Sequence, residues 1–344
     1  MNTRSDRPVL GITMGDPAGI GPEIIIKSLT DPEITNLCTP VVLGDLEILK
    51  KADINFAVLP KLVTTDDLSC DFSNFPTGCL VRLSSLNPNV TELGHPTPDT
   101  GRAMETYINT GVDLALSGAI DAMVTGPITK TGLKLAGSSF HGHTELIAHK
   151  TGTDNFAMMM AGTRLKVVLT TIHIPLSQVP GQLTCREITR IINLTRDTLI
   201  TRFGIPTPRL AVAGLNPHAG EQGMFGNEEA DIILPAIIQA REKGVDIAGP
   251  YPPDTVFFNA VEGRFDAVIC MYHDQGLIPF KLVHFRDGVN TTIGLPIIRT
   301  SVDHGTAYDI AGKGIADPTS MKEAIKMAAV QAVNQKRHGN GNGN

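Results

Sequence analysis

Short apolar runs alternate with longer helical patterns along this chain, and this alternation limits the folds open to it. The apolar runs have the length of buried strands: "PVLGITMG", "PVVLGD", "DAMVTGP", "LKVVLTT", "PRLAVAG" and "FDAVICMY". Patterns typical of helices lie between several of them, at 102–116, 186–202 and 228–241. Because strands that alternate with helices form mainly parallel sheets covered by helices, the chain is predicted to adopt an α/β fold.

The length of the chain predicts more than one lobe. A chain of 344 residues exceeds the usual size of one domain, so we expect two α/β/α lobes with an active-site cleft between them. The polar, proline-containing stretch 59–89 is weakly patterned and is expected to be peripheral. The tail "HGNGNGN" has no apolar side chains to bury, so it is expected to be disordered.

The composition argues against several classes of function. The net charge of −6 is spread without a basic run, which argues against a nucleic-acid partner. No apolar stretch reaches the length of a membrane span, and "MNTRSDRPVLG" is too short and polar for a signal peptide. The five cysteines form no C-x-x-C pair, which is typical of reduced thiols in the cytoplasm. We therefore expect a cytoplasmic protein that binds neither membranes nor nucleic acids.

Three of the predicted strands are followed by a histidine. "LKVVLTTIHIP" leads to His173, "PRLAVAGLNPHAGE" to His218 and "FDAVICMYHDQG" to His273. Ligands of open α/β sheets bind beyond the carboxyl ends of the strands, so these imidazoles could converge on one crevice. Three neutral histidines with open positions suit a catalytic divalent metal. Polar surface or capping roles are the alternative, and the pattern alone leaves both open.

Several other residues suit an anionic substrate. His143 and Thr144 in "FHGHTELIAHK" stand at the predicted start of a helix, where exposed N–H groups attract a carboxylate or phosphate. Lys281, Asn290 and Arg299 follow later in the chain, and a lysine and an arginine that converge would bind a small anion. Taken singly, the helix start is an ordinary capped helix and each cation is a solvated surface charge.

Two glycine-rich segments fall outside the common nucleotide motifs. "GITMGDPAGIGPEI" spaces its glycines as G-x-x-x-G-x-G, which is not the dinucleotide fingerprint. Gly19 and Gly21 there are expected to let the backbone approach a ligand closely, and a tight turn is the alternative. In "VDHGTAYDIAGKGIADP", six residues separate Gly305 from Gly312 and Lys313 precedes a glycine, so this segment is not a triphosphate loop.

These motifs together resemble the family of the 4-hydroxythreonine-4-phosphate dehydrogenases, NAD-dependent enzymes of pyridoxal phosphate biosynthesis. The resemblance runs through "GITMGDPAGIGPE", "VTGPITK", "FHGHTE", "TTIHIPL", "GLNPHAGE", "MYHDQGLIPFK" and "GVNTTIGLPIIRTSVDHGTA". It implies a fold like that of the isocitrate and isopropylmalate dehydrogenases. The first lobe, on the NAD side, would comprise 1–135 and 303–336. The second lobe, with the metal, the substrate and the dimer interface, would comprise 136–302, and 337–344 would be a disordered tail.

The resemblance also implies roles for individual residues. One divalent metal (zinc, magnesium or cobalt) would be bound by His173, His218 and His273. The last of these would come from the partner subunit of an obligate homodimer. The implied substrate-binding residues are His143, Thr144, Lys281, Asn290 and Arg299. "VDHGTAYDIAGKGIADP" is similar to the segment with which β-decarboxylating dehydrogenases hold the adenosine half of NAD, and the implied cofactor-binding residues are His304, Gly305, Thr306 and Ala307.

The implied reaction is the oxidation of 4-phosphooxy-L-threonine (4-hydroxythreonine 4-phosphate) by NAD, with NADP as the alternative cofactor. The metal would acidify the substrate hydroxyl, and a base would take its proton as hydride leaves to NAD. Asp254 and Asp274 are the candidates for this base. The product, 2-amino-3-oxo-4-phosphooxybutanoate, is a β-keto acid, and it would decarboxylate to 3-amino-2-oxopropyl phosphate on the route to pyridoxine 5'-phosphate.

Two other activities fit the same residues. A relative of the same fold that oxidises 4-phospho-threonate or 4-phospho-erythronate would keep the metal, phosphate and cofactor sites, and it would not require an amino group on its substrate. A metal-dependent hydrolase or aldolase could use the same histidines, and it would not need NAD. One sequence leaves the choice among these activities open.

Overall fold

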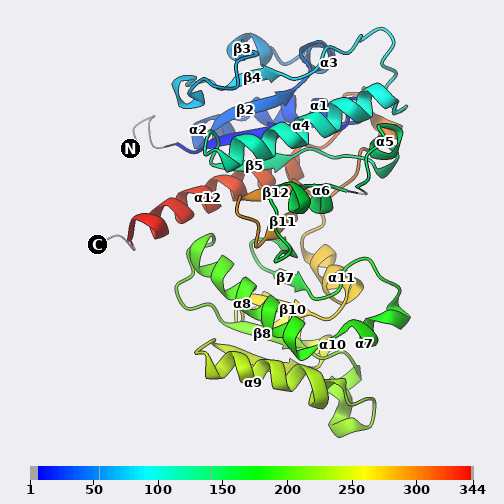
Figure 1. Cartoon of the computed structure of the whole chain (residues 1–344), viewed down its shortest axis with the longest axis vertical. Helices are drawn as coiled ribbons and strands as arrows, with labels where there is room; N and C mark the ends of the chain where they lie inside the picture. The colour runs from blue at the N-terminus through cyan, green and yellow to red at the C-terminus, as the bar shows by residue number, and fades with distance from the viewer. Residues whose placement is uncertain (1–6, 54, 141, 342–344) are drawn as a thin grey trace. The chain divides into compact units, whose positions relative to one another are not determined.

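The computed structural model describes residues 7–53, 55–140 and 142–341. The chain divides into two compact units (Figure 1). The first unit comprises Met1–Asp154 and Leu295–Val333, and the second comprises Asn155–Gly294 and Asn334–Asn344. Each unit is therefore built from two separate segments of the sequence.

The first unit is built on a parallel sheet. Its strand order is β3-β4-β2-β1-β5-β12, and each neighbouring pair runs parallel. The strands span Val9–Thr13 (β1), Thr39–Gly44 (β2), Val63–Thr65 (β3), Cys79–Arg82 (β4), Ala122–Thr125 (β5) and Arg299–Val302 (β12). Every residue of β1 and β2 is buried, as expected of parallel strands that are covered on both faces.

Several helices of the first unit begin at polar caps in the sequence. The helices span Gly21–Leu29 (α1), Pro32–Leu37 (α2), Leu46–Ala52 (α3), Pro98–Leu116 (α4), Lys130–Leu135 (α5) and His143–Lys150 (α6), and α12 (Thr319–Gly341) begins here. Asp31 and Asp45 accept backbone N–H groups in the first turns of α2 and α3, and Thr97 forms a capping box with Thr100 at α4. α4 packs on β1, β2 and β5 (Figure 1).

The stretch 59–89, expected to be peripheral, contains two strands of this sheet. β4 lies between β2 and β3, and its first three residues are buried. Phe72 packs in the same core cluster as Val41 and Cys79. The expectation is wrong for this part of the stretch. Its apolar residues are too few and scattered to show a period in the sequence, and they become buried only because β4 pairs with β2.

The second unit is built on a mixed sheet. Its strand order is β11-β6-β7-β10-β8-β9, and β6 runs antiparallel to both β11 and β7, whereas the other pairs are parallel. The strands span Ala157–Ala161 (β6), Lys166–Leu169 (β7), Leu210–Ala213 (β8), Ile247–Tyr251 (β9), Ala267–Cys270 (β10) and Val289–Ile293 (β11). Its core joins strand residues such as Val167 and Val268 to Phe257 and Phe280 from the helices. Both units confirm the predicted α/β class.

The helices of the second unit follow its parallel strands. They span Val179–Gln182 (α7), Cys185–Thr201 (α8), Leu234–Glu242 (α9), Pro253–Val261 (α10) and His273–Val283 (α11). Thr184 caps α8 by accepting the N–H of Glu187 at 3.1 Å. A π-helical turn, Glu229–Ile233, precedes α9. The 3₁₀ segments of the two units are Leu59–Lys61, Phe72–Asn74, Leu176–Gln178, Pro217–Gly223 and Tyr308–Ile310.

The unit boundaries differ from the expected lobe boundaries. The segments 136–154 and 295–302, expected in the second lobe, belong to the first unit. α6 packs on α4, and β12 pairs with β5. These two contacts attach both segments to the parallel sheet of the first unit, and neither contact has a signal in the local sequence.

The last helix, α12, extends into the segment expected to be a disordered tail. α12 continues through 337–341, where a disordered tail is expected, while 342–344 lie outside the described residues. Packing of buried residues such as Ile325 and Ala328 forms the helix, and each further residue then adds a backbone hydrogen bond. Neither α12 nor any other helix in the described part of the chain is long and apolar enough to cross a membrane.

Candidate functional site

His173 and His273 lie side by side in the second unit. β7 and β10 are parallel neighbours, so the two histidines leave the sheet at the same edge. Thr171 extends the pairing beyond the strands, because its hydroxyl donates to the carbonyl of Met271 at 2.7 Å. The two imidazole ring centres are 5.6 Å apart. Two of the three predicted metal ligands thus stand together within one chain.

These two histidines line a hollow of about 470 Å³. Tyr272 and Asp274 also line it, together with apolar side chains that include Ile172 and Leu176. The carboxylate of Asp274 accepts a hydrogen bond from Nδ1 of His273 at 2.7 Å. Because the carboxylate fixes the proton on Nδ1, it leaves Nε2 of His273 with the lone pair that a metal ion requires.

His218 stands apart from this pair in the same chain. β8 also neighbours β10, but residues 218–222 beyond it have left-handed backbone angles, with φ of 53° at His218 and 52° at Ala219. The ring centre of His218 lies 6.1 Å from that of Phe225. Among the residues that the structure describes, no three His, Cys, Asp or Glu side chains are grouped so that they could hold one metal ion. One chain alone therefore brings together two of the three predicted ligands.

A buried carboxylate holds the left-handed segment that contains His218. Glu229 accepts the backbone N–H of Asn216 at 2.7 Å and its side-chain amide at 3.0 Å, and Glu228 accepts the same amide at 2.8 Å. A Cβ at Gly220 would lie 2.7 Å from the Glu229 carboxylate, and Gly220 has a φ of 83°. Left-handed residues other than glycine cost free energy, and these hydrogen bonds offset that cost. The fold therefore fixes the backbone position of His218.

The two candidate bases differ in their surroundings. Asp274 lines the hollow, and its carboxylate is bonded to His273. Asp254, in the first turn of α10, is exposed and is not among the residues that line the hollow. The structure thus connects Asp274 with the histidine pair, whereas no contact described for Asp254 does so.

Arg299 and His143 form a desolvated group in the first unit. Arg299 is only 2 % exposed, and its Nε and Nη2 donate to the hydroxyl of Thr125 at 3.1 and 2.8 Å. Burial lowers the pKa of Arg299 to about 9. Burial, and then the positive charge of Arg299, hold the pKa of His143 well below its usual range. A bound anion would compensate the buried cation, so this group has the electrostatics of an anion site.

The start of α6 adds donors to this group. Nε2 of His143 is buried and has no hydrogen-bond partner among the described residues. Gly142 at the N-cap offers no side chain to the first N–H groups of the helix, which belong to His143 and Thr144. A helix start without a side-chain cap and a buried ring nitrogen without a partner both fit an anionic ligand.

The other two predicted substrate residues belong to the second unit. Lys281 lies in α11, with its ammonium group 5.7 Å from the ring centre of Phe285. Asn290 lies in β11, opposite Met160 of β6. The side-chain oxygen of Asn290 is buried and has no hydrogen-bond partner in the described part of the chain. The five predicted substrate residues are therefore divided between the two units, three in the first and two in the second.

The predicted cofactor residues form a loop after β12. His304 and Gly305 are exposed, and a Cβ at Gly305 would meet no atom within 4 Å. Thr306 is buried, and Ala307 has a left-handed φ of 42°. Exposed backbone at the carboxyl end of a parallel strand is suited to a phosphate or ribose group.

Gly19 and Gly21 make room for the protein's own chain. A Cβ at Gly19 would lie 3.0 Å from Cβ of Thr306, and one at Gly21 would overlap the carbonyl oxygen of Met14. The N–H of Ile20 donates to the Thr306 carbonyl at 3.0 Å. Thr306 of the loop after β12 and Met14 after β1 thus fill the space beside the two glycines, which supports the alternative of a tight turn. The approach of a ligand to the backbone here stays a prediction.

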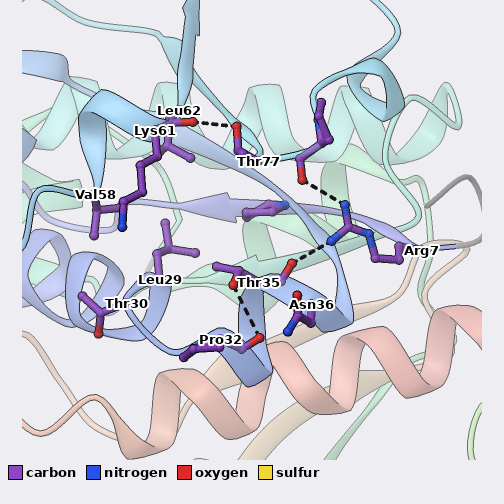
Figure 2. Close-up of a pocket in the computed structure, with 12 residues that line it drawn as sticks. Arg7, Leu29, Thr30, Pro32, Thr35, Asn36, Val58, Lys61, Leu62 and Thr77 are labelled. Atoms are coloured by element: carbon purple, nitrogen blue, oxygen red, sulfur yellow. Dashed lines mark hydrogen bonds between the residues drawn. The ribbon is translucent and has the colours of Figure 1, made fainter. Parts of the chain in front are cut away.

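A separate cavity of about 260 Å³ in the first unit contains none of the predicted site residues (Figure 2). Arg7 lines it and donates to the carbonyls of Thr35 at 2.7 Å and Pro76 at 2.9 Å. The hydroxyl of Thr77 donates to the carbonyl of Lys61 at 2.6 Å. Because these polar groups bind one another, the cavity ties chain segments together and we assign no ligand to it.

Two residues of these sites were not predicted from the sequence. Tyr272 lines the hollow. Burial raises the pKa of its phenol, and the negative charge of Asp274 raises it further. The phenol therefore stays protonated and can donate a hydrogen bond. Its position next to His273 in "MYHDQG" was the available signal. Glu229 holds the segment around His218, but in "GNEEAD" it resembles an ordinary acidic helix start. Only its burial distinguishes it.

Comparison with known proteins supports the resemblance found in the motifs. The family model described as "Pyridoxal phosphate biosynthetic protein PdxA" matches residues 36–328. A 4-hydroxythreonine-4-phosphate dehydrogenase of Desulforapulum autotrophicum is 62 % identical over 328 residues, which cover 95 % of this chain and 96 % of that protein. A D-threonate 4-phosphate dehydrogenase of Salmonella typhimurium is 44 % identical over 321 residues, which cover 93 % and 97 %.

A solved structure extends the similarity to three dimensions. The crystal structure of 4-hydroxythreonine-4-phosphate dehydrogenase from Klebsiella pneumoniae has a TM-score of 0.83 and 43 % identity, and the match covers 96 % of this chain and 98 % of that one. The similarity in sequence and in fold therefore extends over nearly the whole of both chains. The chain belongs to the family of the pyridoxal phosphate biosynthetic protein PdxA.

Proposed function

We propose that this chain is an NAD-dependent dehydrogenase that oxidises 4-phosphooxy-L-threonine to 2-amino-3-oxo-4-phosphooxybutanoate. The product would lose CO₂ to give 3-amino-2-oxopropyl phosphate for pyridoxine 5'-phosphate synthesis. The observation that carries the proposal is the 62 % identity, over 95 % of the chain, to a relative named for this activity. The compared relatives are all dehydrogenases by name, so the substrate and the cofactor are the specific part of the proposal.

The surroundings of Arg299 and His143 support an anionic substrate. Burial lowers the pKa of the Arg299 guanidinium to about 9, because its positive charge is desolvated. A phosphate or carboxylate of the substrate would stabilise that charge, with Thr144 at the helix start as a further contact. Lys281 suits a second anionic group. The buried oxygen of Asn290 is a hydrogen-bond acceptor, which suits an amino or hydroxyl group of the substrate.

The hollow lined by His173 and His273 supports a divalent metal. Imidazole nitrogen is a good ligand for zinc and cobalt, whereas magnesium prefers oxygen ligands, so the residues present favour zinc or cobalt. When bound, such an ion would lower the pKa of the substrate hydroxyl. Asp274 orients His273 through Nδ1, a positioning role that it would have whether or not it also acts as the base. Asp254 and Asp274 both stay candidates for the base.

A homodimer would complete the set of three histidines. α11 begins with His273 and carries two exposed apolar residues one turn apart on one face, Ile278 (68 % exposed) and Leu282 (87 %), and Phe285 (77 %) follows just beyond its end. Exposed apolar faces of this kind are typical of protein interfaces. A second copy that covers this face would approach the helix that begins with His273. This supports a metal ligand shared across the interface, and the resemblance assigns that ligand to His273.

NAD is the proposed hydride acceptor, with NADP as the alternative. His304 and Gly305 support this because they are exposed and their backbone is accessible after β12. We also propose that the enzyme works in the cytoplasm. All five cysteines are free thiols in the structure, which fits a reducing compartment.

The substrate and the cofactor are tested in one assay. The purified protein is incubated with zinc or cobalt, with NAD or NADP, and with 4-phosphooxy-L-threonine, D-threonate 4-phosphate or D-erythronate 4-phosphate, while NADH or NADPH is followed by absorbance. We expect the highest kcat/KM with NAD and 4-phosphooxy-L-threonine, together with release of CO₂.

The other outcomes separate the alternatives. A higher kcat/KM for D-threonate 4-phosphate would favour the activity of the relative that is 44 % identical. Consumption of substrate without a nicotinamide cofactor would favour a metal-dependent hydrolase or aldolase. If no substrate yields reduced cofactor after the metal is restored, the dehydrogenase proposal fails.

A further inference from the structure

Asp16 and Tyr308 connect the turn after β1 to the loop after β12. Asp16 is fully buried. One carboxylate oxygen accepts the N–H of Ala18 at 2.9 Å, and the other accepts the hydroxyl of Tyr308 at 2.6 Å. The first glycine-rich segment and the cofactor loop are therefore joined through one buried carboxylate.

A second set of contacts holds the far end of the same loop. The ammonium group of Lys27 in α1 donates to the carbonyls of Gly314 at 2.9 Å and Ala316 at 2.8 Å. Glu23 accepts the N–H of Ala316 at 2.8 Å and forms an ion pair with Lys27 at 2.8 Å. The loop is thus attached at two places to the turn and the helix that follow β1.

The part of the loop between these attachments is open to solvent. Gly312, Lys313 and Gly314 are exposed, and the left-handed Ala307 directly precedes Tyr308. An exposed loop would otherwise sample many conformations, and ordering it on binding costs free energy. Burying a carboxylate is costly unless it is hydrogen-bonded, so Asp16 depends on the Tyr308 hydroxyl. This arrangement orders the loop before any ligand binds.

We propose that the Asp16–Tyr308 hydrogen bond is a latch that holds the loop in the conformation that binds the nicotinamide cofactor. Tyr308 is then a positioning residue, and the motif "GITMGDPAGIGPE" serves as the platform for the loop. This inference rests on the proposed function, because it takes the cofactor role of the loop as given. Preorganisation lowers the cost of binding, so loss of the latch weakens cofactor binding and leaves the chemistry on bound cofactor unchanged.

The test replaces one hydroxyl group. Tyr308→Phe keeps the ring and removes the donor. Tyr107→Phe is the matched control, since Tyr107 is a fully buried residue of the same unit whose hydroxyl is hydrogen-bonded to Ser84 and not to the Asp16 carboxylate. The chain has no tryptophan, so the fluorescence of bound NADH can be measured without energy transfer from that side chain. We expect Tyr308→Phe to raise the Kd of NADH and the KM of NAD about tenfold, with kcat changed by less than about twofold.

Two further measurements keep the result unambiguous. Hydrogen–deuterium exchange of the amides in 304–313 is expected to be faster in Tyr308→Phe than in Tyr107→Phe, with no cofactor present. Asp16→Asn in the Tyr308→Phe background is expected to add little to the rise in Kd, because both substitutions break the same bond. A wild-type Kd in Tyr308→Phe overturns the latch, as does a loss of kcat and Tm at unchanged Kd. A wild-type protein that binds neither NAD nor NADP overturns the proposed function itself.

Discussion

At the scale of single residues, burial decides what the charged groups of this protein can do. Arg299 and His143 are ordinary surface candidates in the sequence. The structure desolvates both side chains, and the positive charge of Arg299 disfavours a second positive charge on His143. A positive charge in such surroundings costs free energy because water is excluded, and a bound anionic ligand offsets that cost. The residue identities were predictable, whereas their electrostatics were not.

The lowered pKa of His143 predicts a pH dependence of stability. Histidine in the unfolded chain titrates near its ordinary value of 6.5, and in the folded chain it titrates lower. As pH falls through 6.5, the unfolded chain takes up a proton that the folded chain does not, so stability present above that pH is lost below it. We expect the Tm of the wild type to fall more steeply than that of His143→Gln from about pH 7.5 to about pH 5.5.

Calorimetry at a series of pH values measures this difference. His95→Gln is the control, because it removes an exposed histidine in place of a buried one. Parallel curves for the wild type and His143→Gln would contradict the assignment of His143 as a buried neutral imidazole.

At the scale of elements, the segment after β8 is the least regular part of the structure and one of the most tightly held. Five successive residues, 218–222, have left-handed backbone angles, and four of them are not glycine. Glu229 and Glu228 hold the segment through Asn216. Strain of this kind persists only where the surrounding structure enforces it, and it is common at functional sites. This supports the functional role proposed for His218.

Gly220→Ala is predicted to destabilise the protein more than an equivalent glycine substitution elsewhere. Gly244 has a φ of 80° against 83° for Gly220, but a Cβ at Gly244 would meet no atom within 4 Å. We expect Gly244→Ala to cost about 1 kcal/mol, the cost of the backbone conformation alone. Gly220→Ala is expected to cost about 2–3 kcal/mol, because its methyl group also displaces the Glu229 carboxylate. Urea unfolding measures both, and equal costs would contradict the role of Glu229.

At the scale of the whole molecule, one chain does not complete the proposed metal site. His173 and His273 stand together, but among the described residues no third ligand of the His, Cys, Asp or Glu type joins them. The exposed apolar face of α11 offers a surface for a second copy. The resemblance assigns the shared ligand to His273. The ring pair within one chain suggests the other assignment, in which His218 is the shared ligand.

Mixing two inactive variants distinguishes the two assignments. His173→Ala and His273→Ala are each expected to abolish activity. If His273 is the shared ligand, a mixed dimer of these variants contains one intact site, and a refolded equimolar mixture is expected to regain about one quarter of the wild-type activity. We expect this recovery. If His173 and His273 of the same chain bind the same metal, every site of the mixture lacks a ligand, and the mixture would stay inactive.

The sequence by itself determined the α/β class, the residue types of the sites and the family. Strand length, helical period and end caps are local properties, so they can be read without the fold. Long motifs in a fixed order identified the candidate site residues, and they too can be read from the sequence alone. The sites themselves were predictable as lists of residues, not as arrangements.

The tertiary structure alone decided how those residues are arranged. It made β4 part of a buried sheet, separated His218 from the other two histidines, and turned Gly19 and Gly21 into contacts with the protein's own chain. The Asp16–Tyr308 bond joins positions 292 residues apart. Burial, left-handed backbone and long-range hydrogen bonds depend on segments that meet only after folding, and a local pattern contains no information about which segments those are.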